Sequence, residues 1–78
     1  MKITLDKLKK GQKAIIKEVH LEELPLKLLE MGCLPSNAVE LLHIAPLGDP
    51  MYFNINDSHV AIRKETAREI EIAIINNI

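Results

Sequence analysis

Residues 45–50, which read Ala-Pro-Leu-Gly-Asp-Pro, constrain the fold of this chain more than any other segment. They separate two apolar-rich runs whose composition is typical of half-buried strands. Pro46 and Pro50 have no N–H to donate to a strand ladder, so they belong where strands end. Gly48 accepts a positive φ without steric cost. The segment therefore predicts a rigid turn that joins two strands.

Other turn signals divide the rest of the chain into short segments. Apolar residues recur at helical spacing from Leu24 to Met31, where Pro25 suits the first turn and Gly32 follows the end. Isoleucines alternate with other residues in 70–74, as in a strand with one wet face. The predicted elements are strands at 12–19, 39–44, 51–55, 59–62 and 70–74, a helix at 25–31, and helical turns at 4–8 and 64–69.

About five short strands make a sheet that is too small to hide its edges except by closure. The expected fold class is mainly β: a small barrel of about five strands with one short inserted helix and a short helical turn before the last strand. The 78 residues are enough for a single domain, spanning 1–78.

The composition argues against nucleic-acid binding. The hydrophobic share of 47% is almost entirely aliphatic, with one Tyr, one Phe and no Trp, and the net charge is -1. Proteins that bind single strands need aromatic platforms and a basic groove. We therefore expect no nucleic-acid partner.

The single cysteine and the short apolar runs indicate a cytoplasmic protein. Cys33 is the one cysteine, so no disulfide can form within the chain, as is usual in a reducing compartment. The apolar runs are too short to span a bilayer, and the first residues lack the apolar region of a signal peptide. Direct membrane insertion is not expected. The oligomeric state is left open, with a homo-oligomer as one option.

Three blocks of sequence carry a family resemblance. Residues 28–35, 39–50 and 61–67, which include Met-Gly-Cys-Leu-Pro and the turn described above, closely resemble the ferrous iron transport protein A (FeoA) family in order and spacing. The resemblance covers nearly the whole chain. It implies an SH3-like barrel, in agreement with the predicted strands.

The resemblance also implies a function. Members of the family are small cytosolic proteins that accompany the ferrous iron permease, whose cytosolic part contains a GTP-binding domain, and the family has no known catalytic centre. The same SH3-like module occurs as the C-terminal domain of metal-dependent repressors. No helix-turn-helix precedes it here, which favours an accessory protein. A metal-binding or metal-sensing module is the alternative.

Ser36 departs from the family pattern, since a glycine commonly follows the proline of this turn. Either the turn has no positive φ, or Ser36 is mildly strained, with Asn37 able to absorb the difference.

The chain shows no catalytic constellation, and we predict neither enzymatic activity nor a cofactor. Its three glycines are scattered and form no phosphate-binding loop. Asp49, between a glycine and a proline, is predicted to be a turn former that bonds its own backbone. An arginine such as Arg63 or Arg68 could enter a GTPase site of a partner. For Arg63 a surface ion pair with Glu65, Glu69 or Glu71 is the favoured role.

Metal binding has weak support. Cys33 and the three histidines, His20, His43 and His59, include no closely spaced ligand pair. The favoured interpretation places Cys33 in the core and makes His43 a packing residue. A site formed by Cys33 and His43 remains the alternative.

The leading hypothesis is a protein-binding adaptor that docks on the permease and its cytosolic GTP-binding domain. A preset loop loses little ordering entropy on binding, so the 45–50 turn is the preferred contact, with helix 25–31 as the second candidate. The candidate contact residues are Pro46, Leu47, Gly48, Asp49, Pro50, Met51 and Arg63.

Overall fold

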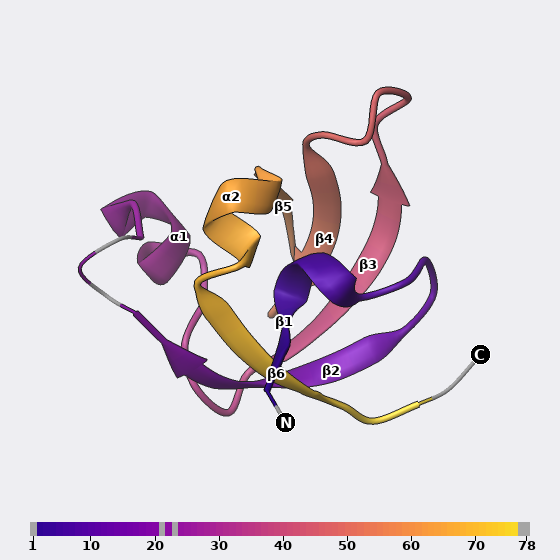
Figure 1. The fold of residues 1–78 in the computed structure, drawn as a ribbon. Helices are drawn as coiled ribbons and strands as arrows, with labels where there is room; N and C mark the ends of the chain where they lie inside the picture. Colours follow the sequence, from indigo (N-terminus) through magenta and orange to yellow (C-terminus); the bar gives the residue numbers. More distant parts are fainter. Residues whose placement is uncertain (1, 21, 23, 77–78) are drawn as a thin grey trace.

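The computed structural model describes residues 2–20, 22 and 24–76, in which six antiparallel strands form a curled sheet (Figure 1). The strand order is β1-β6-β2-β3-β4-β5. The elements are β1 (Ile3–Thr4), the 3₁₀ helix η1 (Leu5–Lys7), β2 (Lys13–Val19), α1 (Leu26–Glu30), β3 (Ala38–Ile44), β4 (Met51–Ile55), β5 (Ser58–Ile62), α2 (Lys64–Ala67) and β6 (Ile70–Ile74). The mainly β prediction is confirmed.

The sheet is barrel-like without being closed. Its register shifts on β2 between Ile16 and Glu18 and on β3 between Leu41 and His43, and such bulges bend and twist strands strongly. The order of the described strands leaves β1 and β5 as edges, so the complete closure expected from the sequence does not occur. The extra strand, β1, has two residues and thus no alternation that a sequence pattern could reveal.

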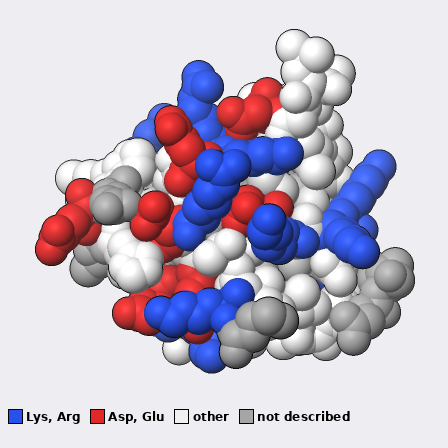
Figure 2. Space-filling model, in the orientation of Figure 1, with Lys and Arg blue, Asp and Glu red and all other residues white. Residues whose placement is uncertain are grey.

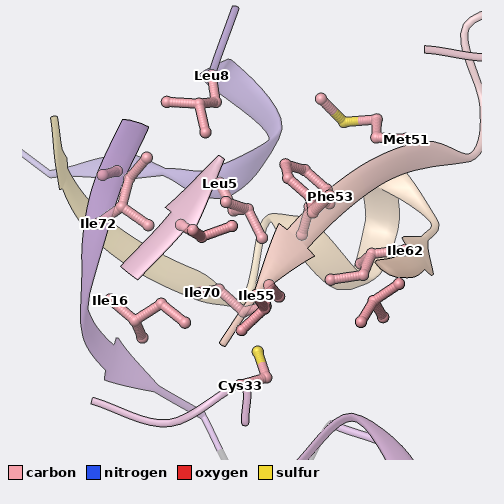
Figure 3. Close-up of a cluster of buried hydrophobic side chains, with 14 of the residues drawn as sticks. Leu5, Leu8, Ile16, Cys33, Met51, Phe53, Ile55, Ile62, Ile70 and Ile72 are labelled. Carbon is pink, nitrogen blue, oxygen red and sulfur yellow. The ribbon is translucent and has the colours of Figure 1, made fainter. Parts of the chain in front are cut away.

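Alternation of side chains builds the core (Figure 3). On β4, Met51, Phe53 and Ile55 are at most 1% exposed, whereas the residues between them are half-buried on the other face. Leu5 of η1 and Ile70 of β6 close the same cluster and are fully buried. The core therefore draws on every part of the sheet, as a small domain requires.

The sequence also predicts a tight hairpin at residues 56–58, between the strands 51–55 and 59–62, and the β4–β5 turn confirms it. Asn56 and Asp57 both have positive φ, 51° and 64°, between the paired residues Ile55 and Ser58. This is the pattern of a type I′ turn, whose twist suits antiparallel strands.

The turn that precedes β3 resolves the question of Ser36. The Asn37 N–H donates to the Leu34 carbonyl at 3.2 Å, with Pro35 and Ser36 in the two central positions. Ser36 has a φ of 79°, which is the left-handed position of a type II turn. The second alternative is therefore correct, and Ser36 occupies a conformation that glycine adopts without strain.

Candidate functional site

The β3–β4 turn projects from the body of the protein (Figure 1). The strand ladder runs to the pair Ile44 and Met51. Beyond it, the Ala45 N–H donates to the Pro50 carbonyl at 3.0 Å, and the Gly48 N–H donates to the Ala45 carbonyl at 2.7 Å. Gly48 has a φ of 93°, as expected for a glycine in this turn. The predicted turn between two strands is confirmed.

The tip of this turn is apolar and open to solvent. Leu47 is 97% exposed, and Pro46 beside it is also exposed. Figure 2 shows the end of the projection without charged side chains, above a body covered by mixed charges. A leucine in this position contributes almost no burial to folding. It is therefore available for contact with another molecule.

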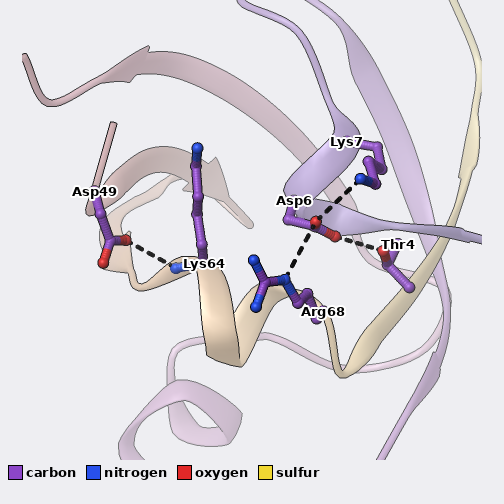
Figure 4. A network of polar contacts seen from close by, with 6 residues as sticks. All are labelled: Thr4, Asp6, Lys7, Asp49, Lys64 and Arg68. Atoms are coloured by element: carbon purple, nitrogen blue, oxygen red, sulfur yellow. Dashed lines mark hydrogen bonds and ion pairs between the residues drawn. The ribbon is translucent and has the colours of Figure 1, made fainter. Parts of the chain in front are cut away.

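Asp49 fastens the turn to α2. Its Oδ1 accepts a hydrogen bond from the backbone N–H of Lys64 at 2.8 Å (Figure 4). The prediction that Asp49 bonds its own backbone is thus wrong, because the first N–H groups of α2 need an acceptor. The residue before α2, Arg63, makes no side-chain cap there. Asp49 is a structural anchor of the turn.

Two other candidate contact residues have different surroundings from those expected. Met51 is 1% exposed and points into the core, so its side chain is not part of the surface. Arg63 is exposed, but the predicted pairing with Glu65, Glu69 or Glu71 is absent from the ion pairs among the described residues.

Arg68 takes part in a different polar cluster. Its Nε lies 3.8 Å from Oδ2 of Asp6, and the Lys7 Nζ lies 3.9 Å from the same oxygen (Figure 4). The other carboxylate oxygen, Oδ1, accepts a hydrogen bond from the Thr4 hydroxyl. The Asp6 side chain is only 7% exposed. This cluster joins η1 to α2, so a structural role accounts for Arg68.

The two residues of the alternative metal site lie in different environments. Cys33 is 1% exposed in the core, and burial raises the pKa of its thiol to about 11, which disfavours the thiolate that metals need. His43 is exposed on β3 and stacks on Tyr52, with ring centroids 4.4 Å apart. The described residues contain no group of three His, Cys, Asp or Glu side chains that could hold a metal ion.

Sequence reasoning missed the aromatic pair at the base of the projecting hairpin. His43 and Tyr52 are cross-strand partners, and Ile44 next to them is 40% exposed. A bulge after Leu41 shifts the register, so simple alternation along β3 does not reveal the pairing. The apolar tip therefore continues into an aromatic and aliphatic base.

The sequence matches the model of the FeoA domain over residues 3–74. It is 35% identical over 74 residues to the Fe(2+) transport protein A/Fe(2+) transporter FeoB fusion protein of Porphyromonas gingivalis, covering 94% of this chain and 9% of that protein. The chain thus spans about a tenth of the length of this curated relative.

Solved structures of FeoA proteins have a similar fold. FeoA from Chlorobium tepidum superposes with a TM-score of 0.86 and 28% identity over 95% of this chain and 71% of that one. Zinc-complexed FeoA from Stenotrophomonas maltophilia, described as a prokaryotic SH3 domain protein, gives a TM-score of 0.76 and 20% identity over 91% and 89%. T. acidophilum IdeR shares the fold with a TM-score of 0.80 and 13% identity, over 95% of this chain and 34% of that one. The expected SH3-like fold is confirmed.

Proposed function

The chain belongs to the FeoA family, and from this premise we propose that it is an accessory domain of ferrous iron uptake that docks on the ferrous iron permease. The observation that carries the proposal is the Porphyromonas gingivalis relative, whose name joins Fe(2+) transport protein A to the transporter FeoB in one polypeptide. Covalent fusion holds two domains at a high effective concentration, which favours a working contact between them.

The projecting β3–β4 turn supports this role through its shape and chemistry. Pro46 and Leu47 are presented on a backbone already fixed by two hydrogen bonds within the hairpin and by the Asp49 anchor to α2. A rigid loop pays little ordering entropy when it binds. We assign the contact to this tip, with Ile44 and the His43–Tyr52 pair as its base.

The role is recognition, and the partner is the GTP-binding domain in the cytosolic part of the permease. Docking there requires the protein to be cytoplasmic. None of the helices in the described residues is long and apolar enough to cross a membrane. The metal-sensing alternative gains no support from the geometry of Cys33 and His43, since one is buried and the other is exposed.

Titration of the permease's purified cytosolic region, followed by calorimetry, tests the proposal. We expect a complex that Leu47→Asp weakens by about tenfold or more, because a charge would replace an apolar contact at the interface. Ile75→Asp is the matched control, since Ile75 is also an exposed aliphatic residue, 57% exposed, but lies after β6. No complex with the native protein would refute the docking.

GTP turnover measured in the same mixture defines the consequence of docking. An unchanged rate with a measurable complex supports an adaptor. An accelerated rate would make the protein an activator of the GTP-binding domain, and Arg63→Ala would then show whether that arginine contributes.

A further inference from the structure

One edge of the sheet offers unpaired backbone groups. β5 ends the strand order and pairs with β4 alone among the described strands. Hydrogen-bonded and non-hydrogen-bonded pairs alternate along the β4–β5 ladder, beginning with the hydrogen-bonded pair Ile55–Ser58 at the turn. The backbone groups of Ser58, Val60 and Ile62 therefore bond β4. The N–H and C=O groups of His59 and Ala61 point away from β4, and neither residue has a backbone partner in the described part of the chain.

A groove follows this edge. Two adjoining hollows of about 250 and 240 Å³ share Lys27 and Leu28 of α1 and Ala61 of β5 in their walls. Consecutive residues of β5, 59–61 in one hollow and 61–62 in the other, line them. Successive side chains of a strand point to opposite faces, so hollows lined in this way lie along the edge of the strand. We call this groove, between α1 and β5, the edge groove.

The edge groove has apolar walls and a cationic rim. Leu28 and Met31 of α1 supply apolar wall, while Lys27 and Arg63 are exposed at the rim. Neither cation belongs to an ion pair among the described residues, and no acidic residue in that part of the chain lines either hollow. Carboxylates on a partner would complement this charge.

From these features we propose that the edge groove binds an extended segment of a partner protein in which apolar and acidic side chains alternate. The segment adds to β5 as a further strand, and its backbone bonds the free groups of His59 and Ala61. Its apolar side chains face Leu28 and Met31, and its carboxylates lie near Lys27 and Arg63. No residue of the β3–β4 turn lines either hollow, so Leu47→Asp tests docking through that turn and Lys27→Glu tests this proposal.

The test uses a capped heptapeptide of alternating glutamate and valine, titrated into the isotope-labelled protein and followed by NMR. Binding should slow amide hydrogen exchange of His59 and Ala61 by about tenfold or more, because these N–H groups become hydrogen-bonded. Lys27→Glu should weaken binding by about tenfold. Lys10→Glu, which makes the same charge change at an exposed residue that lines neither hollow, is the matched control.

Two further reagents separate strand addition from simple charge attraction. Ala61→Pro removes an N–H that β4 does not use, a change that edge strands tolerate, and it should weaken binding. A peptide with N-methylated amides on its β5-facing edge keeps every side chain, yet should bind about tenfold more weakly, whether or not the proline variant folds.

Three results would overturn the proposal: no binding of the glutamate-valine peptide, equal binding of its N-methylated form, or equal binding of a lysine-valine peptide. A fourth is concentration-dependent protection of His59 and Ala61 in the protein alone, which would assign the edge to a second copy of this chain.

Discussion

Two of the turns that contain a glycine with positive φ have opposite surroundings. Gly32 follows α1, and a Cβ added to it would lie 2.9 Å from the Asn56 Cβ. Gly48 lies in the projecting β3–β4 turn, where the nearest atom to an added Cβ is the Lys64 Nζ at 3.5 Å. One turn is packed against the fold, and the other stands out from it.

The packed turn is fully explained by folding. In residues 32–37 the Cys33 side chain is buried, and the Ser36 N–H donates a hydrogen bond to the Ile16 carbonyl of β2. The side-chain amide of Asn37 donates to the Gly32 carbonyl at 2.7 Å. Within the described residues, the projecting turn bonds another element only through Asp49 and Lys64. Its exposed leucine contributes almost no burial to the fold, in keeping with the docking proposed for this tip.

The largest predicted difference comes from replacing each glycine with alanine. Gly48→Ala should lower the free energy of unfolding by about 1 kcal/mol, the cost of a left-handed Cβ. Gly32→Ala adds a clash with Asn56 and should cost about 3 kcal/mol in all. Urea unfolding of both variants checks the pair. Equal losses would show that the two turns do not differ in packing.

The hydrogen bond from Lys64 to Asp49, which anchors the projecting turn, should contribute less to stability than the Gly32→Ala change removes. Asp49→Ala removes the acceptor for the Lys64 N–H and should lower the free energy of unfolding by about 1 kcal/mol, as helix caps do. Asp49→Asn keeps an acceptor oxygen and should lose only part of this. Thermal and urea unfolding distinguish the two variants, and an identical loss in both would show that the carboxylate charge, not the hydrogen bond, is responsible.

A substitution in the packed turn should stabilise the protein. Ser36 has a φ of 79° in a type II turn, so Ser36→Gly relieves strain, and the greater freedom of glycine in the unfolded chain offsets part of the gain. We expect a net increase of about 0.5 kcal/mol in the free energy of unfolding. Ser36→Ala, which keeps a Cβ, is the control and should bring no gain in urea unfolding.

The sequence predicted the turns better than their contacts. The glycines, the prolines and the Asn56–Asp57 hairpin have strong local preferences, so five strands, the helix and both helical turns were found. The burial of Met51 follows from its alternation with Phe53 and Ile55 on β4, a local pattern that could have revealed it. By contrast, the two-residue β1 and the Asp49 bond to Lys64 depend on which distant segments meet. The stacking of His43 on Tyr52 depends on a bulge. Such features depend on tertiary structure and leave no local pattern.

The smallest effect on stability is predicted where the largest effect on binding is expected. Leu47 is 97% exposed, so Leu47→Asp should change the free energy of unfolding by less than about 0.5 kcal/mol. Leu5→Ala in the core, where the side chain is fully buried, should cost about 3 kcal/mol and serves as the contrast. Urea unfolding measures both. A marked loss of stability in Leu47→Asp would mean that the projecting turn serves folding after all, and the contrast between the two turns would disappear.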